Sequence, residues 1–377
     1  MTSLLVSATL RGMGLNCGIV GLPNVGKSTI FSALTRSEAL IANYAFATID
    51  PNVGIVDVPD PRLKKIAAYI PPQKLVPATV EIVDIAGLVK GASQGKGRGN
   101  QFLANIRGVD AILHVVRCFE NADIEHVENR VDPLDDREII NLELALADLD
   151  SVSKRIPKVE KLARAQDKDA KAQLEVLEKL KVHLDQGKPA RGLSLTSDEK
   201  ALVRDLFLIT LKPMIYVANV DEEGLKKEPA YVDALRKAAA ADGAETLALC
   251  GKLEADIAAL DDEEERMLFL AESGLEESGL DRLVHAAYRT LGLRTYFTAG
   301  ETEVRALTFH EGDRAPQAAG VIHSDFEKGF IKAEVYHYDD LMELHSEAEI
   351  RLKGKLRIEG KEYMVQDGDI MHFRFNV

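Results

Sequence analysis

Short apolar runs recur along the first two thirds of the chain, separated by segments whose apolar residues have helical spacing. Each run has about the length of one strand and is rich in valine, isoleucine and leucine. Apolar strands that alternate with helices are typical of a parallel sheet in an α/β fold. The predicted strands are Asn16–Val20, Val53–Val58, Ala78–Gly87, Ala111–Cys118, Lys212–Asn219 and Thr246–Gly251, and the predicted helices include Ile30–Leu34 and Asn100–Arg107.

The stretch from Asp132 to Gly187 has a different pattern, because it is almost free of glycine and proline apart from Pro133 and Pro157. Its leucines recur at helical spacing, which predicts two long antiparallel helices, a hairpin inserted into the α/β domain. These leucines are Leu142, Leu144, Leu146 and Leu149 in the first half and Leu174, Leu177, Leu180 and Leu184 in the second.

The predicted hairpin is locally basic. Between Lys154 and Lys171 it has seven cations and three anions, an excess of four positive charges. This pattern predicts either a solvated helix face or a docking surface for an RNA-rich partner.

The pattern changes again near residue 293, where short strands and tight turns replace the helices. Turns at Glu311–Asp313 and Asp367–Asp369, with an alternating run over Ile370–Phe375, predict a compact β-rich module. Its own charge is negative, which disfavours nonspecific RNA binding and favours docking of a partner or a ligand. The expected organisation is an extension or leader over 1–13, an α/β domain over 14–131 and 201–292, the hairpin over 132–200 and the β-rich module over 293–377.

Size and composition agree with a protein of two or three domains. The chain has 377 residues, 46% of them hydrophobic and 29% charged, and no apolar run approaches the roughly 20 residues that cross a bilayer. Its formal charge of −14 disfavours general nucleic-acid coating, so neither a membrane nor sequence-specific DNA is an expected partner. The cysteines Cys17, Cys118 and Cys250 have no metal-ligand spacing and are expected to be reduced core residues of a cytoplasmic protein.

A phosphate-binding loop follows the first predicted strand. Gly21–Thr29 fits the pattern G-x-x-x-x-G-K-[ST] at every fixed position, between a strand and a helix. Its backbone N–H groups and the helix N-terminus are expected to hold a polyphosphate, and Lys27 adds a positive charge. Ser28 is the expected magnesium ligand. The nucleotide-binding residues predicted here are Asn24, Val25, Gly26, Lys27, Ser28 and Thr29.

Two further segments have the pattern of γ-phosphate sensors. Thr48, in a loop before the second strand, is a candidate second magnesium ligand. The strand that begins at Ala78 ends in D-x-x-G, which places Asp84 where it can hold magnesium through a water. Gly87 then offers a backbone N–H to the γ-phosphate. The following Lys90–Asn100, with four glycines and three cations, predicts either a switch that orders on phosphate or a solvated loop.

The group that positions the attacking water is not where many GTPases have it. Leu88 occupies the place of their glutamine, and an aliphatic side chain cannot orient water. His114 lies within an apolar strand and is expected to be a core histidine. His126 follows in a polar loop at the carboxyl end of that strand, so it is either the catalytic replacement or a solvated loop histidine.

The loop after Asn219 bears on the choice of base. A GTPase would have N-K-x-D here, but this chain has Val220 at the lysine position and Glu222 at the aspartate position. The longer glutamate is poorly placed for the two guanine hydrogen bonds, whereas Asn219 can face an adenine edge. Asn219, Val220 and Glu222 are therefore predicted to bind the nucleotide, with ATP favoured over GTP. The alternative is a degenerate guanine loop that is compensated elsewhere.

Taken together, these motifs resemble the Obg-related family of translation-associated P-loop proteins, in particular its YchF or Obg-like ATPase branch. The resemblance runs from Gly14 to Val377 and departs only in the leader and at Gln94 and Arg98. Its markers are GLPNVGKST at Gly21, DIAGLVKGASQGKGRGNQF at Asp84, NVDE at Asn219, TYFTAG at Thr295, APQAAGVIHSDFEKGFI at Ala315 and DGDI at Asp367.

The resemblance implies a Ras-like P-loop NTPase domain with a helical hairpin and a C-terminal TGS domain of β-grasp type. It also implies a slow ATPase that associates with the ribosome, mainly its large subunit. His126 matches the family's hydrolytic histidine. Asn24 matches the asparagine with which some relatives hold potassium. Two other hypotheses remain: a GTPase of the Obg class, and a ribosome-binding module in which the bound nucleotide only holds one conformation and is hardly hydrolysed. A metabolic P-loop kinase fits least, since no arginine-rich lid is visible.

Overall fold

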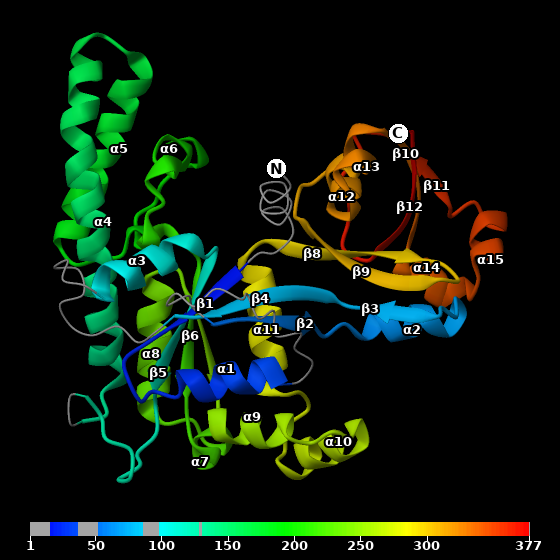
Figure 1. The fold of residues 1–377 in the computed structure, drawn as a ribbon, viewed down its shortest axis with the longest axis horizontal. Helices are drawn as coiled ribbons and strands as arrows, with labels where there is room; N and C mark the ends of the chain where they lie inside the picture. Colours follow the sequence, from blue (N-terminus) through cyan, green and yellow to red (C-terminus); the bar gives the residue numbers. More distant parts are fainter. Residues whose placement is uncertain (1–15, 37–51, 86–97, 128–129, 377) are drawn as a thin grey trace, which may run out of the picture. The chain divides into compact units, whose positions relative to one another are not determined.

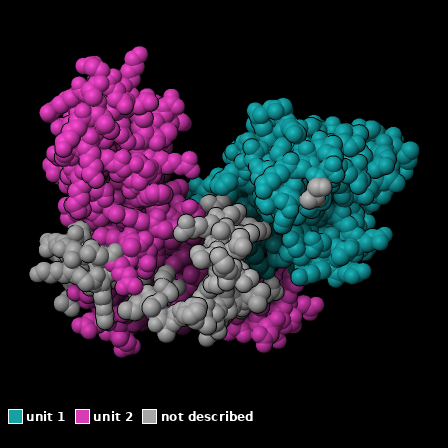
Figure 2. All heavy atoms as spheres, turned by 45° about the horizontal axis from the view of Figure 1, so that its top comes forward, with its two compact units in different colours: residues 1–15, 55–81, 284–377 teal, residues 16–54, 82–283 magenta. Residues whose placement is uncertain are grey.

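The computed structural model of the chain describes residues 16–36, 52–85, 98–127 and 130–376, the first three positions of the third range by backbone alone. The described residues form two compact units, one with residues 55–81 and 284–377 and the other with 16–54 and 82–283 (Figure 2). The fold is the predicted α/β class, with a P-loop domain, a helical region and a β-rich C-terminal region. The predicted domain boundaries stay a prediction.

The sheet that carries the phosphate-binding loop has six strands among the described residues, in the order β2-β4-β1-β5-β6-β7. The pairs β1–β5, β5–β6 and β6–β7 are parallel, as the apolar runs predicted. Every residue of β5 is buried, because the strand lies inside the sheet. The strands are β1 (Asn16–Val20), β2 (Asn52–Val58), β4 (Ala78–Asp84), β5 (Ala111–Arg117), β6 (Met214–Asn219) and β7 (Glu245–Leu249).

Helices connect these strands, as parallel pairing requires. Asp221 caps α7 by accepting a hydrogen bond from the Gly224 N–H at 2.8 Å. Glu254, on α9, accepts hydrogen bonds from the backbone N–H groups of Gly279 and Leu280 at the start of α11. The helices are α1 (Lys27–Arg36), α3 (Arg98–Gly108), α7 (Glu222–Lys226), α8 (Ala230–Ala241), α9 (Gly251–Ala258), α10 (Glu263–Glu272) and α11 (Gly279–Thr290).

The predicted hairpin consists of α4 (Pro133–Arg164) and α5 (Lys168–Asp185), which lie side by side (Figure 1). Asp132 and Asp167 cap the two N-termini with their carboxylates. The chain then passes through α6 (Ser197–Leu202) and the short 3₁₀ turns η2 (Ala190–Gly192), η3 (Arg204–Leu206) and η4 (Ile209–Leu211).

The leucines of α4 do not share one face. Leu144 is fully buried and Leu149 packs in the hairpin core, whereas Leu142 and Leu146 are 46% and 39% exposed. The leucine spacing correctly predicted a helix here, but the four side chains are buried to different extents because α4 packs against α8 and β5 as well as against α5. The α5 leucines Leu177, Leu180 and Leu184 are buried as predicted, with Leu174 packed beside them.

The second sheet combines the C-terminal strands with one strand from the first third of the chain. Its order is β11-β10-β12-β8-β9-β3, and the edge strand β3 (Lys74–Val76) pairs with β9 in parallel. No strand was predicted at 74–76. The other strands are β8 (Leu293–Ala299), β9 (Glu303–His310), β10 (Phe330–His337), β11 (Arg357–Glu359) and β12 (Asp369–Phe375).

Helices of the same unit cover this sheet. Tyr296, Phe309 and Met371 form its core with the buried alanines of α12. The helices are α2 (Pro61–Tyr69), α12 (Ala315–Ile322), α13 (Ser324–Lys328), α14 (Tyr338–Leu344) and α15 (Glu347–Leu352).

Two sequence-based expectations concern the core and the membrane. Cys17, Cys118 and Cys250 are buried free thiols, as predicted. Within the part of the chain that the structure describes, no helix has both the length and the apolar character needed to span a bilayer.

Candidate functional site: a nucleotide pocket at the phosphate-binding loop

The phosphate-binding loop joins β1 to α1, and its shape depends on Gly26. This residue has a φ of 100°, a backbone conformation that favours glycine. A Cβ atom at Gly26 would lie 2.2 Å from Nδ2 of Asn219, so any side chain here would collide with that amide. The loop therefore requires glycine at this position for both reasons, as the motif predicted.

Lys27 begins α1 and lies almost buried beneath the loop, with 8% of its surface exposed. Its Nζ donates a hydrogen bond to the Leu22 carbonyl oxygen at 2.7 Å. Burial lowers the pKa of Lys27 to about 8, and the charge of Asp84 partly opposes this shift. A buried ammonium group with one hydrogen-bond acceptor can donate its remaining hydrogens to phosphate oxygens, which would also compensate its charge.

Asn219, at the end of β6, connects three parts of the pocket. Its Nδ2 donates to the Val25 carbonyl at 2.9 Å, and its Oδ1 accepts from the Gly251 N–H at 2.9 Å. The side chain thus holds the phosphate-binding loop and the start of α9 in register. The predicted contact of Asn219 with an adenine edge stays a prediction. In the structure the side-chain amide bonds to the two backbone groups just named.

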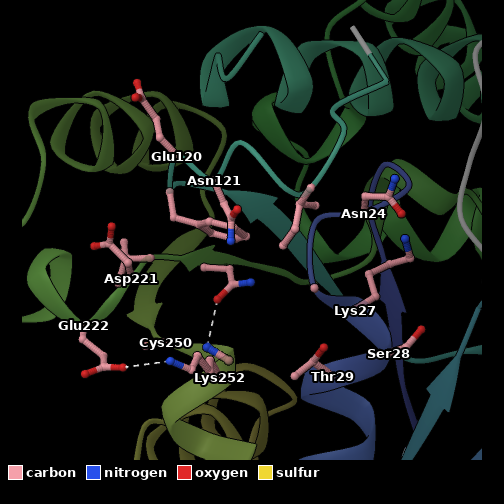
Figure 3. Close-up of a pocket in the computed structure, with 16 residues that line it drawn as sticks. Asn24, Lys27, Ser28, Thr29, Glu120, Asn121, Asp221, Glu222, Cys250 and Lys252 are labelled. Atoms are coloured by element: carbon pink, nitrogen blue, oxygen red, sulfur yellow. Dashed lines mark hydrogen bonds and ion pairs between the residues drawn. The ribbon is translucent and has the colours of Figure 1, made fainter. Parts of the chain in front are cut away.

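A cavity of about 520 Å³ opens beside these residues, a volume suited to a small-molecule ligand. Lys27 and Ser28 lie at one end, and Asp221, Glu222 and Lys252 lie at the other (Figure 3). Its lining includes Asn24, Gly26, Lys27, Ser28, Thr29, Asn219, Val220 and Glu222 among the predicted residues, and also Phe119, Glu120, Asn121, Ile124, Asp221, Cys250, Gly251 and Lys252. Val25 contributes its carbonyl to Asn219 from the buried side of the loop.

The far end of the pocket is where a base would lie. Glu222 is exposed, and its Oε1 lies 3.5 Å from Nζ of Lys252 (Figure 3). Val220 is buried, with its N–H bonded to the Leu249 carbonyl at 2.9 Å. The carboxylate at the guanine-reading position is therefore paired with a cation, and the adjacent side chain is apolar.

Arg117 shapes one wall of the pocket, a role that the sequence analysis missed. Its guanidinium is buried at the end of β5 and donates to the carbonyls of Phe119, Asn121 and Ile124 at 3.0–3.1 Å. These three residues line the cavity. An arginine at the end of a strand that is apolar apart from His114 was the signal available in the sequence. Its five donors suit it to fix several carbonyls of one loop.

His126 lies near this wall but is directed to α4. Its Nε2 is 2.9 Å from Oδ2 of Asp136, and the side chains are 3% and 2% exposed. Burial raises the pKa of Asp136, while the hydrogen bond to His126 opposes the rise. His126 does not belong to the described cavity lining, and its predicted catalytic role stays a prediction. His114 is 1% exposed, as predicted for a core histidine, and burial lowers its pKa to about 3.

Comparison with known proteins decides the family. The chain is 55% identical to the ribosome-binding ATPase YchF of Bacillus subtilis over 97% of its length and all of that protein. It is equally similar, at 55% identity over the same shares, to the ribosome-binding ATPase YchF of Escherichia coli O157:H7. The chain belongs to the YchF family.

Structure and family models agree with this membership. The solved structure of the Schizosaccharomyces pombe YchF GTPase has a TM-score of 0.85 and 39% identity, covering 97% of this chain and 98% of that one. Residues 293–376 match the YchF-GTPase_C family, described as a protein of unknown function. Residues 16–155 match a family described as a 50S ribosome-binding GTPase.

P-loop domains such as this one commonly use Mg²⁺, and the available oxygen ligands fit that ion. Ser28 is exposed at the phosphate end of the cavity, and Asp84 ends β4 with a half-buried carboxylate. Burial raises the pKa of Asp84, while the charge of Lys27 opposes the rise. The described residues contain no cluster of three or more metal-ligating side chains. This is compatible with Mg²⁺, which needs one or two protein oxygens besides phosphates and waters.

Some residues of the predicted YchF-type site fall outside the described part of the chain. These are Thr48 and Gly87, together with Leu88 and most of the predicted switch. Their predicted roles stay predictions.

Proposed function

We propose that the protein binds ATP in this pocket and hydrolyses it slowly to ADP and phosphate, as a nucleotide-dependent switch on the ribosome. The observation that carries the proposal is the pocket itself, which has a phosphate-binding loop at one end and a paired Glu222–Lys252 at the other. The ribosome-binding ATPases of the YchF family support the ATP and ribosome assignments. Ribosome association implies a cytoplasmic protein, and the proposed docking is mainly to the large subunit.

In the proposed reaction a water attacks the γ-phosphorus, the bond to the β–γ bridging oxygen breaks, and ADP leaves. Lys27 and the loop amides neutralise charge on the phosphate oxygens. Asn219 keeps the loop in the shape that does so. His126 is the proposed group that orients the attacking water, and for this it must leave Asp136. Slow turnover follows, because the resting contact competes with the catalytic one.

Mg²⁺ would supply charge neutralisation between the phosphates. Ser28 and Thr48 are the proposed direct ligands, and Asp84 is proposed to act through a water. A potassium ion is a narrower proposal. Asn24 donates its Nδ2 to the Glu125 carbonyl at 3.1 Å, which leaves its side-chain oxygen as the atom that would ligate K⁺. Hydrolysis rates in matched potassium and sodium buffers test this, with equal rates contradicting it.

A GTPase is the second candidate, because the Schizosaccharomyces pombe relative and the family matched by residues 16–155 are both described as GTPases. Guanine recognition needs an acidic group that accepts hydrogen bonds from the base. Here Glu222 faces Lys252 instead. In this exposed pair, with 3.5 Å between the two groups, Lys252 competes with the base for the carboxylate and so weakens the attraction for guanine relative to adenine.

Titration calorimetry of ATP and of GTP in magnesium buffer is the direct test. ATP is expected to bind more tightly than GTP and to be hydrolysed. Lys252→Ala should reduce the preference for ATP over GTP, because it releases the Glu222 carboxylate. The control is Lys226→Ala, which changes an exposed lysine on α7 outside the cavity lining and should leave that preference unchanged. Tight GTP binding with no ATP binding would overturn the proposed activity.

Ribosome association is tested separately by cosedimentation with isolated large and small subunits. The protein with a non-hydrolysable ATP analogue is expected in the large-subunit pellet, and less of it with ADP. Equal pelleting in both nucleotide states would contradict a switch and favour a constitutive binding module.

A further inference from the structure

His126 and Asp136 form a buried contact between the pocket wall and the first turn of α4. The imidazole Nε2 lies 2.9 Å from Asp136 Oδ2. While Nε2 is paired with the carboxylate, this nitrogen cannot also orient an attacking water, which leaves only Nδ1 and the position of the side chain to consider. The neighbouring Ile124 lines the cavity while His126 does not, so the loop presents its histidine away from the nucleotide side.

Asp136 belongs to a firmly anchored turn. The next residue, Arg137, donates to the Ala238 carbonyl at 3.2 Å and forms an ion pair with Asp242, which fastens α4 to the C-terminal end of α8. Asp132 caps the same helix end. His126, by contrast, belongs to a loop with no regular secondary structure. Arg117 and Asn24 hold the loop backbone as far as Glu125, so we expect the contact to open by movement of the His126 side chain and not of α4.

The closed contact leaves the carboxylate incompletely satisfied. Oδ1 of Asp136 is buried and has no hydrogen-bond partner among the described residues. Burial raises the pKa of Asp136, the effect expected when a carboxylate loses water. A carboxylate that gives up hydration for one good hydrogen bond regains water on opening. The hydration that the carboxylate regains on opening therefore offsets part of the free energy lost with the hydrogen bond.

We propose that Asp136 is a latch that holds His126 outside the nucleotide pocket, so that hydrolysis waits until this contact opens. The inference rests on the proposed role of His126 in orienting the attacking water. Asp136 acts through His126 and is a positioning residue.

A hydrogen bond links the latch to the phosphate-binding loop. Nδ2 of Asn24 donates to the carbonyl of Glu125, the residue before His126. Asn24 has a φ of 61° and lines the cavity, so a bound polyphosphate lies next to the residue that holds the histidine loop. Nucleotide binding at one end of this hydrogen bond can therefore change the loop at the other.

The test measures ATP turnover of the full chain with Asp136→Asn and its matched control Asp135→Asn. Asp135 lies in the same helical turn, is 42% exposed and pairs with Arg130 rather than His126. Both variants remove one negative charge from the same helix end. Asp136→Asn is expected to raise kcat about tenfold, equivalent to about 1.4 kcal/mol, with KM for ATP unchanged. Asp135→Asn should behave as the wild type.

The double variant His126→Ala with Asp136→Asn should lose this gain. If Asp136→Asn is as slow as the wild type or slower while His126→Ala abolishes turnover, the latch is wrong and the proposed function stands. A gain that persists without His126 would also overturn the latch. If His126→Ala alone keeps full turnover, the proposed role of His126 fails instead.

A measurement on the wild type keeps the inference testable even if Asp136→Asn does not fold. In ¹⁵N-histidine NMR spectra, the Nε2 resonance of His126 is expected to move when a non-hydrolysable ATP analogue binds, because its carboxylate partner is lost. An unchanged resonance in the saturated complex would overturn the latch.

Discussion

The ammonium group of Lys27 is almost buried, and within the described part of the chain one carbonyl oxygen accepts a hydrogen bond from it. The ammonium bonds to the Leu22 carbonyl and is otherwise desolvated. Without nucleotide this burial costs free energy, and a bound polyphosphate repays the cost with oxygen ligands. A residue that serves binding is thus expected to weaken the empty protein.

Lys27→Met should stabilise the nucleotide-free protein by about 2 kcal/mol at pH 7, because it removes a buried cation. The pKa of Lys27 is lowered from 10.5 to about 8, so the unfolded chain holds this proton more tightly than the folded one. The cost is therefore fully present below about pH 8 and is relieved as the pH rises toward 10.5. Urea unfolding should therefore show that the gain in free energy of unfolding from Lys27→Met is smaller at pH 10 than at pH 7.

Adding Mg·ATP reverses the order of stability. The wild type should gain stability with nucleotide concentration, whereas Lys27→Met should show little response. An equal response of both proteins would contradict the assigned role of Lys27.

At the scale of elements, α4 is joined to the sheet domain through a buried carboxylate. Asp148 is fully buried and accepts hydrogen bonds from the N–H groups of Ile209 and Thr210 and from the Thr210 hydroxyl, at 2.7–2.9 Å. These hydrogen bonds hold the turn η4, which leads into β6 and so toward Asn219. The hairpin helix therefore helps to place the strand that positions the phosphate-binding loop.

Asp148→Ala is expected to lower the free energy of unfolding by about 3 kcal/mol, since two buried N–H groups lose their acceptor. Urea unfolding at pH 7 measures the change. The matched control is Asp150→Ala on the same helix, because Asp150 is 61% exposed and pairs with the exposed Lys154. No measurable change is expected there. Equal effects of the two substitutions would contradict the assigned role of Asp148.

At the scale of the whole molecule, the chain crosses between the two compact units more than once. Residues 55–81 belong with the C-terminal residues 284–377, although the segments on either side of 55–81 belong to the other unit. Within the first of these units, β3 pairs with β9, and Arg62 of α2 forms an ion pair with Asp367 at 2.7 Å. The C-terminal unit is therefore built from two segments that are far apart in sequence.

Arg62→Ala should destabilise this unit by about 1–2 kcal/mol. The guanidinium is 25% exposed and contacts both Asp60 and Asp367, and it also lies over the ring of Phe297 at 5.2 Å. Lys65→Ala, an exposed position on the same helix, is the matched control and should have no measurable effect. Thermal unfolding of the full chain at neutral pH compares the two.

The effect of Arg62→Ala should depend on pH. Burial tends to raise the pKa of Asp367, but hydrogen bonds from Arg62 and from the Thr295 N–H outweigh it and lower the pKa below the ordinary 3.8. Such a group stabilises the fold above its unfolded pKa, and this stability is lost as the pH falls through the folded pKa. The difference between wild type and Arg62→Ala should therefore shrink below about pH 4. A constant difference down to pH 2 would contradict the ion pair.

Features that depend on neighbouring residues could be predicted from the amino-acid sequence. The phosphate-binding loop could be predicted because Gly26 and Lys27 act through adjacent backbone groups and a helix end. The parallel α/β fold, the hairpin and the buried His114 follow from local apolar patterns in the same way. Family membership was also readable, because whole motifs at Gly21 and Asp84 are preserved.

The way in which distant side chains share the site depends on the folded chain and could not be predicted. Asn219 bonds to Val25, 194 positions earlier in the chain, and no local pattern reports that contact. The pairing of β3 with β9 and the carbonyl cluster around Arg117 were likewise not predicted, because each depends on which segments the fold brings together. His126 could be named as a candidate from its place after β5, but its partner Asp136 could not, since a hydrogen bond between two buried side chains is set by packing and not by sequence spacing.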